Sequence, residues 1–184
     1  MSTIISGSSP SVTFSDGSTQ SSAASSAMTL IQTIVPTATT TINFTSIGSY
    51  SAYVLVGNNI QLASQDIVLL QVGTGGGPTY TTSGYYYQLG YFSGTGYSGA
   101  SSTSFGGLRL GTISTAINNF YCQIFVASSL VTAQSQSYNS ATPYEYIIGS
   151  GYPTTLVPTA FQITTNSSTN FVAQGKLSLY GISS

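Results

Sequence analysis

Ionisable groups are scarce in this sequence. Of its 184 residues only 3% are charged, against about 25% in a typical soluble domain. The five charged residues are Arg109, Lys176, Asp16, Asp66 and Glu145. Histidine is absent and Cys122 is the single cysteine. The sequence therefore excludes a catalytic Ser-His-Asp or Cys-His relay, an intramolecular disulfide and the usual Cys/His zinc site.

The same scarcity argues against two kinds of partner. Two cations cannot form the basic surface that nucleic-acid binding requires, so we expect no nucleic-acid partner. A membrane-spanning helix needs roughly 20 consecutive apolar residues, and the most apolar runs, 28–36, 67–72 and 120–127, are much shorter. No charged segment precedes an apolar stretch, so we expect neither a signal peptide nor membrane insertion.

The apolar content is nevertheless high enough for a folded core. Hydrophobic residues make up 41% of the chain, with 14 tyrosines and 8 phenylalanines, whereas disordered chains are poor in both classes. Residues 1–27 differ, because they are mostly serine, glycine, proline and alanine, with isolated apolar residues such as Val12 and Phe14. We therefore expect a short extended N-terminal arm, ordered by a partner chain, and a folded domain over residues 28–184.

The domain is predicted to be mainly β. Segments rich in β-branched and aromatic residues alternate with Gly, Asn, Ser and Pro turns, and no window has the apolar spacing of a helix. About eight to ten short strands of this kind predict an antiparallel β-sandwich, jelly-roll-like in character. The predicted strands are 29–35, 50–56, 60–72 (one bent strand or two), 85–92, 108–117, 120–127, 144–148, 159–165 and 171–182.

Two of these segments allow a prediction of side-chain orientation. In the segment 123–127 the four residues after Gln123 are all apolar, which indicates a strand buried on both faces and places Cys122 in an apolar environment. Alternation over 176–180 places Leu177 and Leu179 on one face and the polar residues on the other.

A tyrosine- and glycine-rich tract over residues 80–97 contains six of the 14 tyrosines. Tyrosine combines an apolar ring with a hydroxyl and can both stack on a sugar and hydrogen-bond to it. We predict a glycan-binding loop over 91–97, with 85–87 in support; its residues are Tyr91, Ser93, Thr95 and Tyr97. The alternative is a β-hairpin whose rings pack on neighbouring strands or on another subunit.

The carboxylates provide little basis for catalysis. A glycosidase needs two at a defined separation, and nothing in the spacing of Asp66 and Glu145 brings them together. We expect them to pair with Arg109 or Lys176, or to cap turns. No clustered acidic loop predicts a calcium site, so we expect no catalytic residue, no metal and no cofactor.

Both ends of the chain resemble known proteins. The segment 12–24, VTFSDGSTQSSAA, resembles a motif of tail-fibre and receptor-binding proteins of tailed bacteriophages that reads apolar-x-Phe-x-Asp-Gly-Thr-Thr-Gln followed by small residues. Here Ser18 stands where threonine is usual. The segment 175–182, GKLSLYGI, is similar to the closing strand of small phage β-sandwich domains.

The resemblance implies a virion protein, with the tail favoured over the head. In that family such segments sit in intertwined, usually trimeric stems, which implies a homotrimer joined to other virion proteins through the arm. The residues that match the motif, and that would serve in oligomerisation or attachment, are Val12, Phe14, Asp16, Gly17, Thr19 and Gln20.

Three functions follow from this reading. The leading one is a tail fibre or receptor-binding protein that attaches the particle to a host-surface glycan without catalysis. The second is a head fibre or capsid decoration protein. The third, a polysaccharide-degrading tail enzyme, is disfavoured because the chain has no histidine and only three carboxylates.

Overall fold

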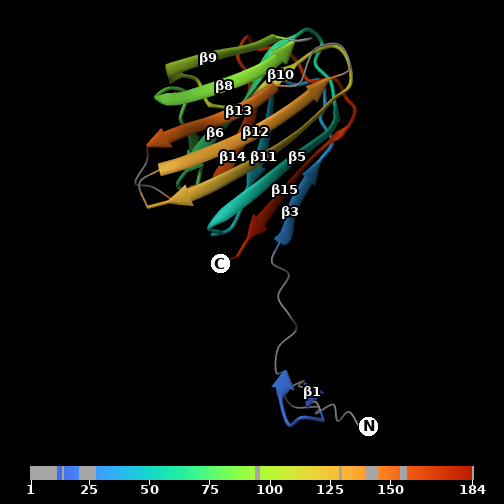
Figure 1. Ribbon diagram of the computed structural model, residues 1–184, viewed down its shortest axis with the longest axis vertical. Coiled ribbons are helices and arrows are strands. Elements are labelled where there is room, and N and C mark those ends of the chain that lie inside the picture. Colours follow the sequence, from blue (N-terminus) through green and yellow to red (C-terminus); the bar gives the residue numbers. More distant parts are fainter. Residues whose placement is uncertain are drawn as a thin grey trace.

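The computed structural model describes residues 12–13, 15–20, 28–93, 96–128, 130–139, 145–153 and 157–183 (Figure 1). Every regular element in these ranges is a β-strand and every strand pairing is antiparallel, which confirms the predicted β-sandwich. Within these ranges no helix is long and apolar enough to span a membrane.

The sandwich is built from one large and one small sheet. The large sheet has eight strands, in the order β3 (Met28–Ile34), β15 (Lys176–Ile182), β5 (Ala52–Ile60), β11 (Asn118–Ala127), β12 (Leu130–Asn139), β13 (Glu145–Pro153), β8 (Tyr85–Ser93) and β9 (Gly96–Phe105). The small sheet has five strands, in the order β10 (Leu108–Ile113), β6 (Asp66–Thr74), β14 (Ala160–Thr165) and β4 (Thr41–Thr45), with β7 (Thr79–Tyr80) paired to β6.

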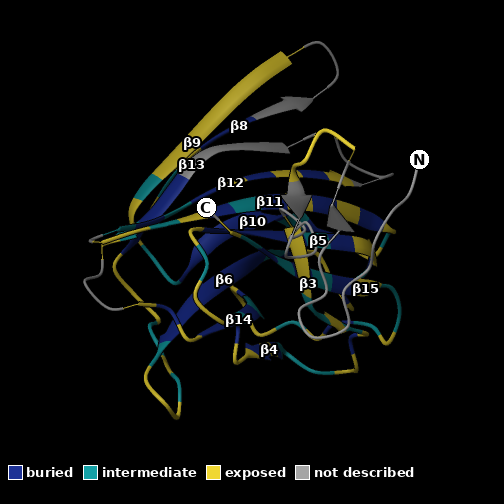
Figure 2. Ribbon diagram, turned by 90° about the horizontal axis from the view of Figure 1, so that it is seen from below, coloured by how far each residue is buried: buried dark blue, intermediate teal, exposed yellow. Residues whose placement is uncertain are grey.

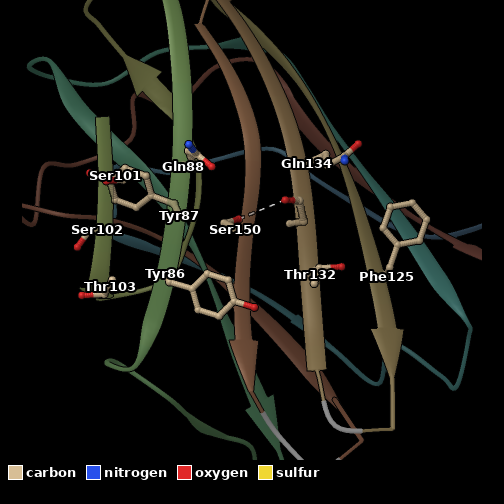
Figure 3. A pocket seen from close by; sticks show the side chains of 11 residues that line it. Tyr86, Tyr87, Gln88, Ser101, Ser102, Thr103, Phe125, Thr132, Gln134 and Ser150 are labelled. Carbon is tan, nitrogen blue, oxygen red and sulfur yellow. Dashed lines mark hydrogen bonds between the residues drawn. The ribbon is translucent and has the colours of Figure 1, made fainter. Parts of the chain in front are cut away.

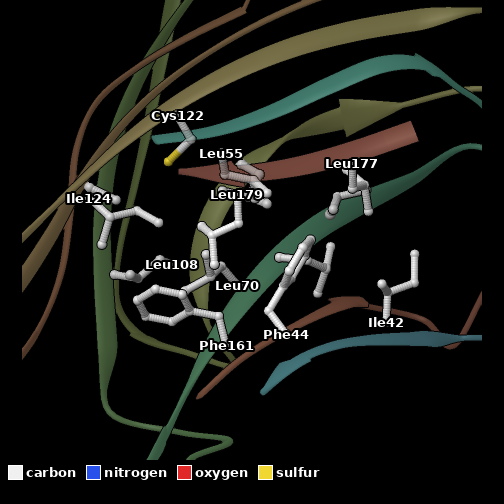
Figure 4. Packing of buried hydrophobic residues seen from close by; sticks show 14 of the residues in the cluster. Ile42, Phe44, Leu55, Leu70, Leu108, Cys122, Ile124, Phe161, Leu177 and Leu179 are labelled. Atoms are coloured by element: carbon white, nitrogen blue, oxygen red, sulfur yellow. The ribbon is translucent and has the colours of Figure 1, made fainter. Parts of the chain in front are cut away.

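Apolar side chains from the facing surfaces of the two sheets form a single core (Figure 4). The ring of Tyr53 on the large sheet meets Phe161 on the small sheet edge-on, with the ring centroids 5.1 Å apart. Leu177 and Leu179 are fully buried, as the alternation predicted. Cys122 is also fully buried, and this confirms its predicted place among apolar side chains.

Hydroxyl groups tie the two sheets together where aliphatic side chains do not. Tyr85 on β8 is fully buried, and its hydroxyl accepts a hydrogen bond from the Val72 amide of β6 at 2.8 Å and donates to the Thr81 carbonyl at 3.1 Å. Ser135 on β12 donates to the Leu110 carbonyl of β10 at 2.5 Å. These two buried hydroxyls are tolerated because each has a hydrogen-bond partner.

The structure corrects the sequence reading at several strands. The segment 123–127 is not buried on both faces, because Phe125 points outward and is 46% exposed. Strands β4, β9 and β12 lie where the sequence predicted none. Strand β9 contributes almost no buried residue and extends past the small sheet (Figure 2), so no apolar pattern marks it.

The described part of the arm is a small hairpin rather than an uninterrupted extended segment. Strands β1 (Val12–Thr13) and β2 (Thr19–Gln20) pair across a turn at Asp16 and Gly17. The Asp16 carboxylate accepts hydrogen bonds from the Ser18 hydroxyl and amide, which hold its pKa below the usual value. Phe14 lies outside the described residues, as do the side chains of the paired strand residues.

Candidate functional site

Exposed aromatic side chains gather on the outer face of the eight-stranded sheet. Five of them come from four neighbouring or nearby strands and are between 40% and 62% exposed: Tyr86, Tyr97, Tyr121, Phe125 and Tyr138. The strand register accounts for this face, because alternate residues of each strand point away from the core. Exposed aromatic rings concentrated on one face are characteristic of a binding surface rather than of ordinary solvent-facing sheet.

A shallow trough of about 680 Å³ crosses this face between β8, β9 and β11 (Figure 3). One cross-strand row forms part of its floor, in which Tyr86 pairs with Gly151, Gly151 with Thr132, and Thr132 with Phe125. Figure 3 shows Tyr86 and Phe125 at the two ends of this row, with Thr132 between them. The lining of the trough thus includes one aromatic ring from β8 and another from β11.

Two tyrosines extend across glycines of the adjacent backbone. The phenol end of Tyr86 covers Gly151 on β13, and that of Tyr97 covers Gly90 on β8, so that a Cβ atom at either glycine would overlap the ring. Because neither glycine has a side chain, each ring can lie low on the sheet surface.

Amide and hydroxyl groups lie between the rings. Gln88, Ser101, Thr132 and Gln134 line the trough. A smaller hollow of about 210 Å³ adjoins it, contains Tyr97 and shares Gln88 and Ser101 with it. A third hollow, of about 300 Å³, lies farther along the sheet beside Tyr121 and Tyr138. Each amide group offers both donors and acceptors, which suits a ligand rich in hydroxyls.

Among the residues whose side chains the structure describes, no charged one lines any of these three hollows. Arg109 belongs to the inner side, where it is 8% exposed, lies 5.2 Å from the centre of the Tyr87 ring and donates a hydrogen bond to Thr112 at 3.0 Å. Lys176 lies at the start of β15, opposite Asn58. The described side chains of this face therefore offer aromatic rings and neutral hydrogen-bonding groups.

Asp66 serves as a turn cap, one of the two roles predicted for it. It is 7% exposed, and its two carboxylate oxygens accept hydrogen bonds from the amides of Ile67 at 2.7 Å and Ser167 at 2.8 Å. Glu145 begins β13 on the other sheet, and its side chain lies outside the described residues. Among the residues described, no group of three or more His, Cys, Asp or Glu side chains could hold a metal ion.

The predicted recognition loop is in fact the end of the β8–β9 hairpin. Tyr91 pairs with Ser98 and Ser93 with Gly96, so these positions are strand rather than loop. The side chains of Tyr91 and Ser93, and Thr95 as a whole, lie outside the described residues. Of the four predicted contact residues, the structure places the side chain of Tyr97 on the outer face.

The three supporting tyrosines point to different faces of the sheet, because successive residues of a strand alternate between faces. Tyr85 is in the core, and Tyr87 packs inward against Phe105 with the ring centroids 4.9 Å apart. Tyr86 alone of the three points outward. Reasoning from sequence missed Phe125, Tyr121 and Tyr138. The pairings that bring Tyr138 beside Tyr121, and Phe125 into one row with Tyr86, could not be predicted without knowing the strand order.

Comparisons with known proteins give only distant likenesses. No family model and no curated protein matches the sequence. Among solved structures, the chain is similar to the CBM2 module of the evolved Dit of Lactobacillus casei BL23 phage J-1, with 9% identity, a TM-score of 0.25, and coverage of 78% of this chain and 70% of that one. It is also similar to a structure from work on endo-acting O-glycanases that prominent members of the human gut microbiota express to initiate mucin breakdown, with 10% identity, a TM-score of 0.23, and coverage of 72% and 59%.

Proposed function

We propose that this chain is a non-catalytic glycan-binding module of a bacteriophage virion, and that the outer face of the eight-stranded sheet binds the glycan. The observation that carries the proposal is the set of five exposed aromatic rings interleaved with neutral amides and hydroxyls. Sugars present apolar ring faces bordered by hydroxyls, and a site of aromatic faces with a few polar groups is complementary to both.

Attachment without hydrolysis agrees with the chemistry of the carboxylates. Hydrolysis of a glycosidic bond by the common mechanism needs a second carboxyl group placed opposite the first. Both oxygens of Asp66 are already occupied by backbone amides, and Asp66 lies on β6 of the small sheet, not on the aromatic face. The aromatic face therefore supports binding better than it supports acid-base chemistry.

A place in the virion, with the tail favoured, rests on the arm. The motif in residues 12–24 resembles segments of phage tail-fibre proteins, and its Asp16-Gly17 turn joins two short paired strands. So small a hairpin needs further burial to be stable, and other copies of the chain or neighbouring virion proteins would supply it. We propose a homotrimer in which the arm mediates assembly and the sandwich faces the host.

Binding can be tested with the full-length protein on bacterial cells and on their purified surface polysaccharides. We expect Tyr86→Ala and Phe125→Ala each to weaken binding by about 1–2 kcal/mol, as for anchors in other interfaces. Val157→Ala is the matched control, because Val157 is 62% exposed but precedes β14 of the small sheet. Failure of the unmodified protein to bind any host glycan, or equal binding by all variants, would refute the proposal.

Two further measurements separate the remaining functions. Incubation with a bound polysaccharide should release no new reducing ends, whereas a degrading enzyme would release them. Immunogold labelling of intact particles should mark the tail; labelling of the capsid would instead favour a head fibre or decoration protein.

A further inference from the structure

The two tyrosines that cover glycines lie along a single strand pair, and their spacing bears on the form of the ligand. Tyr86 is on β8, and Tyr97 reaches from β9 onto Gly90, four residues farther along β8. At about 3.3 Å per residue, residues 86 and 90 are roughly 13 Å apart. The Tyr86 ring lies over β13 and the Tyr97 ring over β8, so the two low ring platforms are offset by one strand and the line that joins them crosses the strands obliquely.

Polar groups occupy the interval between these platforms. Gln88 lies midway on β8 and pairs with Ser101 of β9. Both residues line the trough beside Tyr86 and the hollow beside Tyr97. The surface thus runs from ring to amide and hydroxyl and again to ring without a break between the two hollows.

The chemistry of this track argues against an acidic ligand as its preferred partner. An acidic sugar would gain from an arginine or lysine, and neither hollow contains one. Removing water from an anion costs free energy, and aromatic rings and neutral amides do not compensate for that cost.

We propose that the track from Tyr86 past Gln88 to Tyr97 binds an internal stretch of a linear, uncharged polysaccharide, with the sugar chain running obliquely from β13 to β8 and one sugar stacked on each ring. The inference rests on the proposed glycan-binding function and adds the charge class, the chain form and the direction of the ligand. A second copy of the chain, seated on the same rings, is the competing occupant.

The first experiment uses the full-length protein on an array of purified bacterial surface polysaccharides, some neutral and others containing uronate, sialate or phosphate. We expect binding to neutral linear polymers that persists in high salt, because no ion pair contributes. Binding to acidic polymers alone would overturn the inference and leave the proposed function intact. Binding to no glycan would remove both.

The second experiment cuts the best neutral polymer into oligosaccharides of graded length and measures the affinity of each. Affinity should increase until the oligosaccharide reaches both platforms and then level off. An affinity that is complete with a single sugar would overturn the extended-chain arrangement while leaving glycan binding in place.

Variants then test whether each of the two ring platforms contacts the sugar chain. Tyr86→Ala and Tyr97→Ala should each lower the affinity for the long oligosaccharide roughly 5- to 30-fold but change the affinity for the shortest binding fragment much less. Tyr86→Phe keeps the ring and should retain most of the affinity. Val157→Ala, which precedes β14 of the small sheet, should leave the affinity unchanged. Thermal melting confirms that each variant is folded. Full affinity in the Tyr86→Ala Tyr97→Ala double variant, or loss of self-association in place of glycan binding, would overturn the proposal.

Discussion

The ring of Tyr86 covers Gly151 across the β8–β13 pair, in a place that a side chain at residue 151 would occupy. Tyr97 stands in the same relation to Gly90. The glycines of this face are thus part of its aromatic surface, because they allow rings of the adjacent strand to lie low on the backbone.

Replacing the glycine should therefore impair binding while the tyrosine is still present. In Gly151→Ala the new methyl group displaces the Tyr86 ring from the sheet, and we expect glycan affinity to fall, as measured by isothermal titration calorimetry. The ring is the far end of a flexible side chain, so the melting temperature should change little. Gly76→Ala is the control, because nothing lies within 4 Å of the Cβ it would add. Unchanged affinity in Gly151→Ala would show that the position of the ring does not matter.

Tyr85→Phe should destabilise the fold by about 1–3 kcal/mol, because it leaves the buried Val72 amide without its acceptor. Tyr86→Phe, which removes the same atom from an exposed ring, should change stability by about 0.5 kcal/mol or less. Urea denaturation of both variants measures the difference. Equal midpoints would mean that another group satisfies Val72.

Stability should be constant between about pH 5 and 8, since no histidine titrates there, and should fall in alkali. Burial raises the pKa of Tyr85 and of Tyr53 above the ordinary value, and raises the pKa of Cys122 to about 12. The unfolded chain ionises first, from about pH 8.5 for cysteine and pH 10 for tyrosine, so stability is complete below these values and is lost as the pH rises toward the folded-state pKa values. The free energy of unfolding, measured by denaturation from about pH 5 upward, should show one decline, on the alkaline side. A decline between pH 5 and 8 would point to a group whose pKa is displaced into that window.

Cys122 should be inert in the folded protein, because its thiol is fully buried and protonated at pH 8. A disulfide reagent such as DTNB should react only after denaturant is added, at the rate of an ordinary thiol. Reaction of the native protein at that rate would mean that β11 opens readily.

Gly17→Val should weaken assembly while leaving the sandwich intact. Gly17 adopts a φ of +83°, which β-branched residues avoid, so the substitution disfavours the β1–β2 hairpin. Sedimentation should show a trimer for the natural sequence and a smaller species for the variant, with the same melting temperature for the domain. A variant that still sediments as a trimer would mean that the arm turn is not needed for assembly.

The sequence was sufficient to predict the fold class but not to predict which residues form the outer aromatic face. The alternation around Leu177 and Leu179 predicted their burial correctly, because hydrophobic and polar residues alternate there in the usual way. Strand β12 escaped notice because two of its inward positions are Ser135 and Ser137, buried at 1% and 4% exposure. In a sequence, serines whose hydroxyls hydrogen-bond across the core cannot be told from loop residues.

The candidate site illustrates a second limit. Tyr85, Tyr86 and Tyr87 are identical in type, yet only the middle one faces outward, and the register with β13 decides which. Phe125 belongs with Tyr86 because three strand pairings place them in one row, although they are far apart in the sequence. Long-range pairing of this kind leaves no local pattern to read.

Strand β9 has consequences for how this protein can evolve. It is an edge strand with almost no buried residue, so most substitutions along it cost the folded state little. On the function proposed here, the same strand contributes Tyr97 and Ser101 to the ligand track. Substitutions in β9 can thus change the ligand specificity while the core stays unchanged. In a lineage selected to infect a new host, sequence differences would accumulate first in this strand.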